Sequence, residues 1–587
     1  MRFVETLGWL RLLMLAAAGR PAFYNRLSVT GRAAMRLAGR LGLSVERLRK
    51  LEIGYLDSAA GVRSAAYANA EASVECAGCI SWAAGLDGAL GINFGLIVEK
   101  YHFEFLYAKY LFLETVLRYA AEHPEERHDL ICEAVFAEPY LDVLAHRKDR
   151  IILRLRRGAW LRFWGGLALL PALLVAHARG MRRQRAQRDQ LICVVDDSTT
   201  QQMFEALFGR DKEILYVVEP HYAAAFVTQV SSAGSLRIAG LSARRWLRLA
   251  AILPRYMVTA FLTAGRLMRY GEMPFVVFDL LCKGRALAPE GPGNVLVTFE
   301  HLTLARSIRN EYLRAEGSVS IYVPKNSYVT YQQYPAEWKL NYDVFCAPGP
   351  HAEELYGRKR ALTGRFPRTG SYDAHRPLAD LEEAHQERLE DLLAFKGSDR
   401  LVTVLTPGIC DETLSSERRL LGLAGRLSLL PGVRVLVRRK PVPPELKYRT
   451  FYEDQLAPYA KIRLTSGEFD LFDFVGPTDI FVTSISTSAC DVASRGGTAL
   501  FIDFMGTPSI YLPLEKVPEM VSTGAEAYDK ITGWLMDREN GPVRSTHRSA
   551  MGRFVDCVGY RFSSFDAYRS NLLAELRPWL TPLRRSH

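Results

Sequence analysis

The chain has 587 residues, which is longer than one hydrophobic core usually serves and predicts two or three domains. Its nine cysteines are scattered and odd in number, which excludes a small disulfide scaffold and favours a reducing compartment. The formal net charge is +11, but residues 147–188 alone contain twelve Lys or Arg and a single acid. The rest of the chain is therefore neutral overall.

Residues 1–125 are predicted to form a helical N-terminal region, in which residues 100–128 are the clearest amphipathic helix. The first twenty residues resemble a signal peptide superficially. Glu5 and Arg11 interrupt the pattern, so we expect an interfacial helix instead. Cys76 and Cys79 form the only CxxC pair, and no second pair stands at the spacing of a zinc site. No metal site is predicted.

Residues 126–190 form a basic amphipathic segment that is predicted to associate with a membrane. Phe163 to Ala178 is apolar but shorter than the roughly 20 residues that a span requires, and it contains Pro171. Arginines flank this run on both sides, so both ends favour the cytoplasmic side. The residues expected at the membrane surface are Trp160, Arg162, Trp164, Arg179, Arg182 and Arg183.

Residues 237–269 repeat this design, with seven arginines, no acid and an apolar run around Pro254. Each basic residue near an anionic leaflet contributes about 1 kcal/mol, so Trp246, Arg248 and their neighbours should hold the protein on an anionic membrane surface. The alternatives are one true span at residues 160–178 and a nucleic-acid-binding arm. The second is disfavoured because the arginines alternate with long apolar runs.

Residues 191–375 alternate strand and helix signals, which predicts a doubly wound parallel sheet with the second amphipathic stretch, 237–269, inserted in it. Residues 128–136 are a candidate further strand of this sheet, in which case the basic segment is an insertion. Several of these strands end in polar residues or glycine: Asp196 and Asp197, Glu300 and His301, and Gly349.

Residues 399–540 repeat the strand and helix alternation and predict a second Rossmann-like domain, joined to the first by a hinge near residues 375–398. Two such domains in series are expected to face each other across a cleft. Residues 541–587 are predicted to be C-terminal helices that return to pack on the first of the two Rossmann-like domains.

Residues 478–503 read as a buried strand, a small polar turn, a short helix and a second strand. Ser484 to Ser488 would lie at the carboxyl end of the first strand, where ligands of open α/β sheets bind. A helix N-terminus lined with hydroxyl groups attracts anions, which predicts a nucleotide mono- or diphosphate site. The alternative is an ordinary βαβ turn capped by serines.

Over residues 190–520 the chain resembles the GT-B class of glycosyltransferases, particularly bacterial surface-polysaccharide enzymes and the related CDP-glycerol glycerophosphotransferases. Their donor-phosphate motif resembles the run Asp479, Thr483, Ser486, Thr487 and Asp491. Many relatives have a histidine before the proline that follows an upstream strand. This chain has Arg438, Arg439 and Lys440 before Pro441, a departure that leaves the identity of the donor open.

The resemblance implies two Rossmann-like domains and a metal-independent transferase with no cofactor, whose nucleotide-sugar donor is a substrate. It implies that Glu300 or His301 deprotonates the acceptor hydroxyl, since either group is chemically competent as a general base, with Asp196 and Asp197 as the runners-up. It also implies that Gly349 and Asp373 line the cleft on the acceptor side. The implied donor-binding residues are Thr406, Gly408, Arg438, Arg439, Lys440, Ser484, Ser486, Thr487, Ser488 and Asp491.

The function that these expectations support is a membrane-associated glycosyltransferase of bacterial cell-surface polysaccharide synthesis. Its acceptor would be lipid-linked or a polysaccharide, and its place the cytoplasmic face of the inner membrane, with no role for nucleic acid. A CDP-glycerol-type polyol-phosphate transferase, a sugar-nucleotide epimerase and a non-enzymatic membrane scaffold are the alternatives. The residues leave the sugar, the nucleotide base, the linkage and the stereochemical outcome open.

Overall fold

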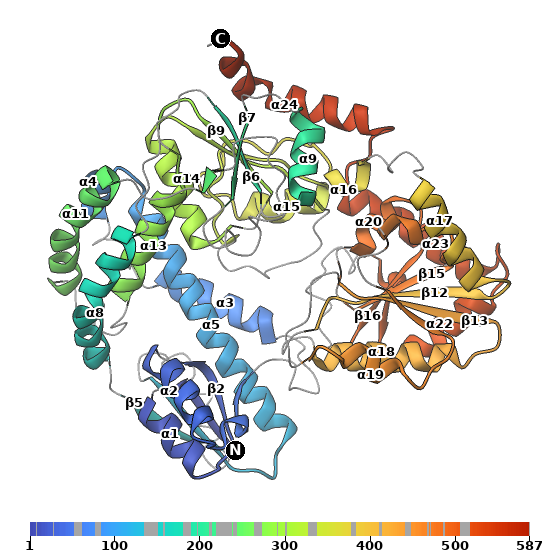
Figure 1. Cartoon of the computed structure of the whole chain (residues 1–587), viewed down its shortest axis with the longest axis horizontal. Helices are drawn as coiled ribbons and strands as arrows, with labels where there is room; N and C mark the ends of the chain where they lie inside the picture. Colours follow the sequence, from blue (N-terminus) through green and yellow to red (C-terminus); the bar gives the residue numbers. More distant parts are fainter. Residues whose placement is uncertain are drawn as a thin grey trace.

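The computed structural model contains three parallel β-sheets, each at the centre of its own lobe (Figure 1). Their strand orders are β3-β2-β1-β4-β5, β11-β10-β9-β6-β7-β8 and β14-β13-β12-β15-β16-β17. Counted from the first strand of each lobe, all three follow the doubly wound order 3-2-1-4-5, and the second and third add a sixth strand. The structure describes residues 1–585 except 8, 28, 52–61, 77–83, 134–150, 157–158, 180–189, 196–197, 210–213, 219–236, 239–242, 263–272, 290, 300–301, 327–336, 377–382, 410–413, 441–447, 466–468, 470, 485, 487 and 505–516.

The first sheet corrects the prediction that residues 1–125 are a helical region. Three of its strands lie there, because a buried strand, a helix and a second strand follow one another from the first residues of the chain. The predicted interfacial helix is α1, which follows β1 and buries Leu12 and Leu15 while Leu10 and Met14 stay exposed. The elements are β1 (Arg2–Leu7), α1 (Trp9–Ala17), β2 (Ala22–Leu27), α2 (Val29–Arg40), the 3₁₀ turn η1 (Val45–Arg47), β3 (Leu48–Lys50), β4 (His128–Glu133) and β5 (Ile151–Arg156).

Strand β4 belongs to the first sheet and not to the sheet of residues 191–375. It pairs with β1 on one side and with β5 on the other. Strand β5 lies inside the basic segment, so residues 126–190 are not simply amphipathic helices inserted into the domain of residues 191–375. They complete the first sheet before the chain enters the second lobe.

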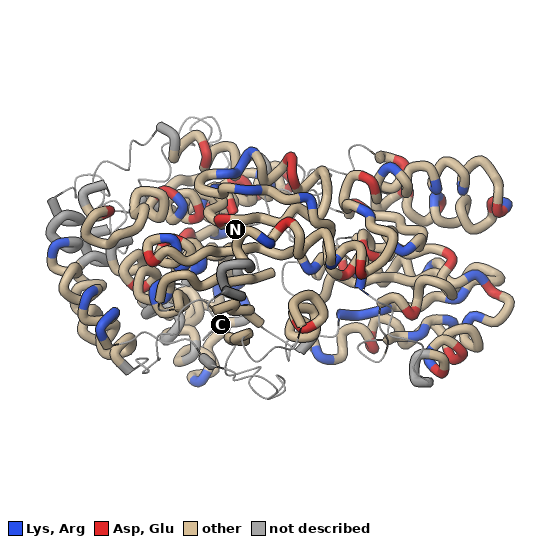
Figure 2. The backbone as a smooth tube through the Cα atoms, turned by 90° about the horizontal axis from the view of Figure 1, so that it is seen from above, with Lys and Arg blue, Asp and Glu red and all other residues tan. Residues whose placement is uncertain are grey.

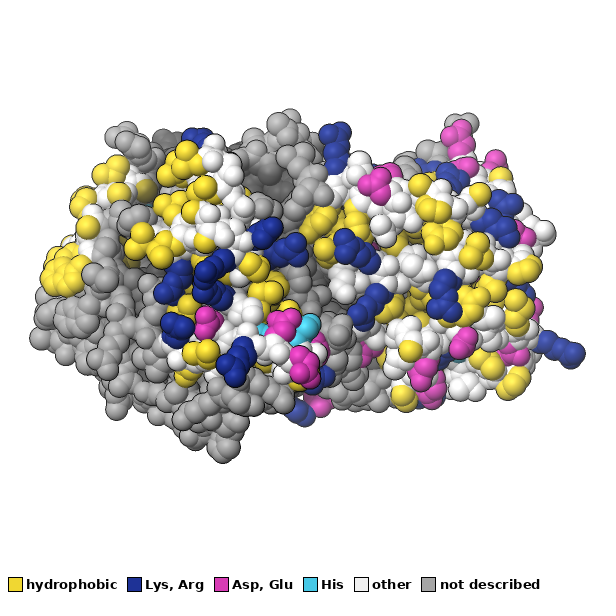
Figure 3. Space-filling view, turned by 90° about the horizontal axis from the view of Figure 1, so that it is seen from below, with side chains coloured by type: hydrophobic (Ala, Val, Ile, Leu, Met, Phe, Trp, Pro, Cys, Tyr) yellow, Lys and Arg dark blue, Asp and Glu magenta, His cyan; other side chains and the backbone are white. Residues whose placement is uncertain are grey.

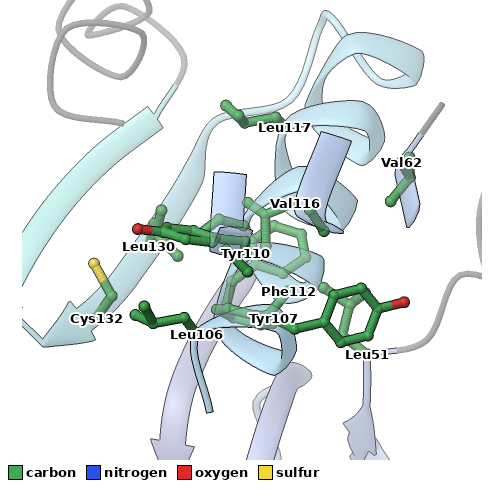
Figure 4. Packing of buried hydrophobic residues seen from close by; sticks show 14 of the residues in the cluster. Leu51, Val62, Leu106, Tyr107, Tyr110, Phe112, Val116, Leu117, Leu130 and Cys132 are labelled. Atoms are coloured by element: carbon green, nitrogen blue, oxygen red, sulfur yellow. The ribbon is translucent and has the colours of Figure 1, made fainter. Parts of the chain in front are cut away.

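Helix α5 (Phe94–Glu122) links the first two lobes. Asn93 caps its first turn by accepting a hydrogen bond from the Leu96 amide at 3.0 Å. Most of its aromatic side chains lie in the core. In Figure 4, Leu106 and Tyr110 point toward Leu130 and Cys132 of β4. Helices α3 (Val62–Cys76) and α4 (Ala84–Leu90) pack beside α5.

The second sheet is the first of the two Rossmann-like sheets that the sequence predicted. Its central strands β6 and β9 are almost fully buried, which explains their uninterrupted apolar sequence. Its elements are β6 (Leu191–Val195), α9 (Ser198–Phe208), β7 (Ile214–Val218), β8 (Arg237–Ile238), β9 (Val295–Thr298), α14 (Leu304–Ala315), β10 (Val319–Tyr322), β11 (Val344–Phe345), α15 (Pro350–Arg358) and α16 (Tyr372–His375).

Three helices form an outlying layer of the second lobe: α8 (Ala159–Arg179), α11 (Ala243–Leu262) and α13 (Met273–Leu287). They pack against one another, and His177 of α8 lies 3.0 Å from Asp279 of α13. Among the described helices none is long and apolar enough to cross a membrane. The predicted alternative of a span at residues 160–178 is therefore not supported within that part of the chain.

The third sheet is the second predicted Rossmann-like sheet, and its strands β12, β13 and β15 pair in register. Two apolar clusters cover its two faces. Its elements are α17 (Glu383–Lys396), β12 (Arg400–Leu405), α18 (Leu414–Ser428), β13 (Val433–Arg438), α19 (Phe451–Leu456), β14 (Ile462–Thr465), η7 (Leu471–Phe474), β15 (Ile480–Thr483), α20 (Ser488–Ser494), β16 (Ala499–Asp503), η9 (Pro518–Met520), β17 (Val521–Thr523), α22 (Ala527–Met536) and α23 (Pro542–Val558).

The last helix, α24 (Phe565–Arg585), returns to the second lobe, as the sequence suggested. Tyr568, Leu572 and Leu576 are fully buried in the apolar cluster that contains strands β6 and β9. Arg569 donates a hydrogen bond to the Leu207 carbonyl at 2.9 Å. The second and third lobes are therefore joined twice, by α17 and by the segment that leads to α24.

Candidate functional site

The topological switch point of the third sheet lies between β12 and β15, the first and fourth strands of that lobe. The loops after these two strands carry the residues predicted to bind a donor. Ser484, directly after β15, is 4% exposed, and its Oγ has no hydrogen-bond partner among the described residues. A buried hydroxyl without a partner is costly, so this atom is the strongest local sign of a ligand site.

The loop after β12 is held by two residues that sequence reasoning missed. The Gly408 amide donates to Glu417 Oε1 at 3.0 Å, and the Tyr452 hydroxyl donates to Thr406 Oγ1 at 3.3 Å. Burial raises the pKa of Glu417 to about 7, and the pKa of Tyr452 is raised by its own burial and by Glu417. Gly408 has φ +96°, which a residue with a side chain rarely adopts.

Three consecutive basic residues lie at the carboxyl end of β13 beside this loop: Arg438 ends the strand, and Arg439 and Lys440 follow it. Arg438 is half-buried, and its guanidinium lies 6.0 Å from the centre of the Phe474 ring. Arg439 donates to Glu453 at 3.0 Å, and both side chains are partly exposed. Lys440 is exposed, and its stem passes Gly408. The edge of the sheet therefore carries more positive than negative charge.

The turn between β15 and α20 is only partly described. Ser486 Oγ accepts a hydrogen bond from the Ser488 amide at 3.3 Å, while Thr487 lies outside the described residues. Helix α20 has only seven residues, so its dipole is a minor source of anion attraction. Asp491 is buried within its first turn. Any anion here would depend mainly on the hydroxyl groups and arginines.

Two members of the donor motif have structural roles instead. Asp479 precedes β15 and pairs with Lys396 at 2.8 Å and Arg400 at 2.9 Å, at the end of the sheet away from Ser484. Thr483 Oγ1 donates to the Leu405 carbonyl at 2.8 Å and ties β15 to β12. The match to the motif at these two positions therefore reflects the construction of the sheet.

Arg495, at the end of α20, joins the second and third lobes. It donates to the Arg376 carbonyl at 2.5 Å and to the Asp373 carbonyl at 3.5 Å. Its guanidinium also lies 4.9 Å from the centre of the Phe472 ring. Asp373, predicted to line a cleft, therefore lies at the contact between the lobes. Its carboxylate is 3.7 Å from Arg376.

Gly349, the other predicted cleft residue, has a packing role. A Cβ placed there would lie 2.3 Å from the Val558 carbonyl, so glycine allows α15 and the end of α23 to approach closely. This contact accounts for the glycine by packing alone, and its assignment to the acceptor side stays a prediction. It is a further link between the second and third lobes.

The predicted catalytic residues Glu300 and His301 lie outside the described residues, as do Asp196 and Asp197. The strands that precede these pairs, β9 and β6, are hydrogen-bonded neighbours. They are the first and fourth strands of the second lobe, so the switch point of that sheet lies between them. The two candidate pairs thus remain predictions.

The residues predicted to face a membrane lie on or near α8 and α11. Trp164 is 54% exposed, Arg248 is exposed, and Trp246 is partly buried against the second lobe. Trp160, Arg162 and Arg179 belong to α8, but their side chains are outside the described part. Arg182 and Arg183 lie outside the described residues altogether.

Glu417 and Tyr452 were missed because neither belongs to a motif and each follows an ordinary helical pattern. The signal for Glu417 was its place near the start of a helix that follows a strand ending in TPG. Arg495 stands before two glycines, where a basic residue at a helix end is unremarkable in sequence. In the part of the chain that the structure describes, no three His, Cys, Asp or Glu side chains gather as for a metal ion.

No protein family model and no curated protein matches the chain. Solved structures match it remotely. The α,α-trehalose-6-phosphate synthase of Burkholderia multivorans is 11% identical, with 68% of this chain and 98% of that chain covered and a TM-score of 0.41. The wall teichoic acid polymerase TagF is 9% identical, with 74% and 99% covered and a TM-score of 0.42. The N-terminal domain of trehalose-6-phosphate phosphatase from Candida albicans is 9% identical, with 68% and 98% covered and a TM-score of 0.38.

Proposed function

We propose that the chain is a membrane-associated, metal-independent glycosyltransferase of bacterial cell-surface polysaccharide synthesis. It would move a sugar from a nucleotide-activated donor to a lipid-linked or polysaccharide acceptor. The observation that carries this proposal is the buried Ser484 hydroxyl, without a partner among the described residues, at the switch point of the third sheet. Arg438, Arg439 and Lys440 stand at the carboxyl end of β13, on the far side of β12 in the same sheet, which suits a phosphate-bearing donor lying across this edge.

The proposed chemistry places the donor phosphates against the Ser484 and Ser486 hydroxyls. Negative charge develops on the departing nucleotide, and Arg438, Arg439 or Lys440 would offset that charge without a metal ion. Glu417 would act as a positioning residue, because it fixes the amide of Gly408 in the loop beside the donor. Glu300 or His301 would take the proton from the acceptor hydroxyl.

Thermal stabilisation by nucleotides tests the donor site. The purified protein is melted with CMP, CDP, UDP, GDP and their sugar conjugates, and the Ser484→Ala/Ser486→Ala variant is compared with Ser494→Ala. Ser494 is the last residue of helix α20, which follows these two serines, and it donates to the Cys490 carbonyl at 2.9 Å, so it is a matched control. A ligand at 100 times its dissociation constant adds about 2.7 kcal/mol of stability, which is readily measured.

The expected result is selective stabilisation by one nucleotide that is lost in the double variant and kept in the control. Stabilisation by a CDP-alcohol would favour the polyol-phosphate transferase. No response to any nucleotide would contradict the transferase and favour a non-enzymatic scaffold.

A separate experiment tests the catalytic base. Loss of a general base lowers kcat by about 10²- to 10⁴-fold, so Glu300→Gln and His301→Asn are expected to differ by that amount. The variant with the larger fall identifies the base, provided that its nucleotide-induced stabilisation is unchanged. Equal activity in both variants and wild type would contradict this part of the mechanism.

The membrane part of the proposal rests on exposed apolar side chains of the outlying helices. Trp164, Leu167 and Val175 of α8 and Leu247 of α11 are 37–60% exposed. Figure 3 shows hydrophobic side chains gathered at the left end of the molecule, the end at which α8 lies in Figure 1. Release of the protein from membranes by carbonate and high salt would support attachment at the cytoplasmic surface. A strict requirement for detergent would contradict it.

A further inference from the structure

A cavity lies in the second lobe, apart from the donor site of the third lobe. It has a volume of about 560 Å³ and is bounded by the start of α11, by α13, by the end of α14 and by the turn after α4. Four arginines and one glutamate line it, so its charged side chains are strongly positive in sum. The charged residues are Arg244, Arg245, Arg248, Arg285 and Glu316.

Three of these arginines occupy the first two turns of α11. The positive end of a helix dipole already disfavours cations, and this 20-residue helix has no acid in its first turn. Glu316 lies 3.9 Å from Arg245 and also pairs with Arg285. Arg244 and Arg248 are exposed at the cavity, where their charges add to that of the helix terminus.

Two buried polar atoms at this cavity independently point to a ligand. The Arg285 side chain is 10% exposed, and its Nη1 has no hydrogen-bond partner among the described residues. Its guanidinium lies 4.7 Å from the centre of the Tyr312 ring. The Tyr312 hydroxyl is likewise buried and lacks a partner within the described part of the chain. Donors of this kind normally have an acceptor when they are buried.

We propose that this cavity binds the phosphate or pyrophosphate group of an anionic molecule. Arg285 and Tyr312 would donate from the inside, while Arg244 and Arg248 would close over the group from α11. Guanidinium groups form strong, charge-assisted hydrogen bonds with phosphate oxygens, and the helix terminus adds to the attraction.

The surroundings favour the headgroup of a membrane lipid as the source of this phosphate. Leu247, on the same helix as the arginines, is 60% exposed, and α8 with its exposed Trp164 packs against α11. Figure 2 shows Lys and Arg positions along the helices at the left end of the molecule. A lipid could therefore place its headgroup in the cavity and its acyl chains along an apolar surface.

Calorimetric titration with inorganic pyrophosphate tests the site. All proteins carry Ser484→Ala/Ser486→Ala, so that binding at the donor site does not contribute. The test variant is Arg244→Gln/Arg248→Gln. The control, Arg255→Gln/Arg538→Gln, removes the same charge from exposed positions outside the cavity, one of them on α11. Loss of two charge-assisted contacts is expected to weaken binding at least about tenfold in the test variant only.

Vesicle binding then distinguishes the sources. Phosphatidylcholine vesicles contain either phosphatidic acid, a phosphomonoester, or phosphatidylglycerol at matched surface charge. A preference for phosphatidic acid that the test variant loses and the control keeps assigns the site to a lipid headgroup. Pyrophosphate binding without such a preference supports the site and assigns it to a soluble phosphate compound.

The proposal is overturned if pyrophosphate does not bind, or if it binds the test and control variants equally. Equal melting temperatures of the two variants show that both are folded. Because the donor site is removed from every protein compared, the outcome does not depend on whether the chain is a glycosyltransferase.

Discussion

The first and third sheets share the strand order 3-2-1-4-5 but place their charges differently. In the first sheet a charge lies in the middle of the central strand β1, where Glu5 pairs with Lys109 of α5 and both side chains are 3% exposed. In the third sheet the interior of β12 and β15 carries no charge: Arg400 opens β12, and Arg438 to Lys440 lie at the carboxyl end of the neighbouring β13. A paired charge inside a sheet holds the lobe together, whereas charges at its carboxyl edge lie where ligands of such sheets bind.

The largest expected effect comes from breaking the buried pair of the first sheet. Lys109→Met leaves Glu5 charged and buried, which should destabilise the first lobe by about 3–5 kcal/mol. Hydrogen exchange of the β1 amides measures this loss locally, which suits a chain with several lobes.

The controls for this prediction lie in the same helix. Glu5→Leu/Lys109→Met removes both charges and is expected to recover most of the loss. Arg118→Met breaks the more exposed pair with Glu122 and should cost at most about 1 kcal/mol. A large loss in Arg118→Met, or none in Lys109→Met, would contradict the role of the buried pair.

The stability of the third lobe should depend on pH through a buried acid at the edge of its sheet, Glu417. The pKa of Glu417 is raised from 4.5 to about 7, so the folded state disfavours its ionised form. Wild type should therefore lose stability relative to Glu417→Gln as the pH rises from about 4.5 to 7, by up to about 3 kcal/mol. Melting curves at pH 5 and pH 8 measure the difference, which should be small at pH 5.

Glu453→Gln is the control for this measurement, since Glu453 is an exposed partner of Arg439 in the same lobe. The difference in stability between Glu453→Gln and wild type should not grow from pH 5 to pH 8 as it does for Glu417→Gln. If Glu417→Gln is no more stable than wild type at pH 8, burial does not disfavour the charge of Glu417.

Substitution of two consecutive residues, Thr483 at the end of β15 and Ser484 directly after it, tests the difference between a side chain inside the sheet and one at its edge. Thr483→Val removes the hydrogen bond to the Leu405 carbonyl and should cost about 1 kcal/mol. Ser484→Ala removes a hydroxyl without a partner among the described residues, so stability should be unchanged or slightly higher. Chemical denaturation measures both changes. A larger loss for Ser484→Ala would show that its hydroxyl is structural.

The smallest effects on stability are expected from arginines at the sheet edges. Arg154→Gln breaks an exposed pair with Asp129 in the first sheet, and Arg439→Gln breaks one in the third. Each should cost at most about 1 kcal/mol. Only Arg439→Gln should also reduce stabilisation by a nucleotide, as measured by thermal shift. An equal reduction by Arg154→Gln would place the donor elsewhere.

The two Rossmann-like domains were predictable because their strands are uninterrupted apolar runs. LICVV, VLVT and IFVT are short, β-branched and flanked by polar turns, so burial on both faces of a parallel sheet follows directly. In the first lobe, RFVETL and IILRLR carry charges at alternate or nearby positions. Their place in a sheet depends on contacts that the local pattern does not contain, such as Lys109 opposite Glu5.

At the candidate site, the hydroxyl and basic residues were predictable from their positions after strands. The motif grouped Asp479 with the donor-binding residues, but its carboxylate pairs with Lys396 and Arg400 at the opposite end of β15. A motif gives the spacing of residues and does not show at which end of a strand a carboxylate finds its partners. Glu417 and Tyr452 were missed because their importance comes from burial beside the loop of Thr406 and Gly408, a long-range property of the fold.

The sequence by itself determined where the chain builds apolar strands, where basic residues accumulate and which loops carry hydroxyl groups, because these features depend on local composition and periodicity. The tertiary structure decided which charges are buried in pairs and which remain at an edge. It also decided that arginines from α11 and α13 share one cavity. The physical reason is that burial and the distance between charges are set by packing between segments far apart in the chain.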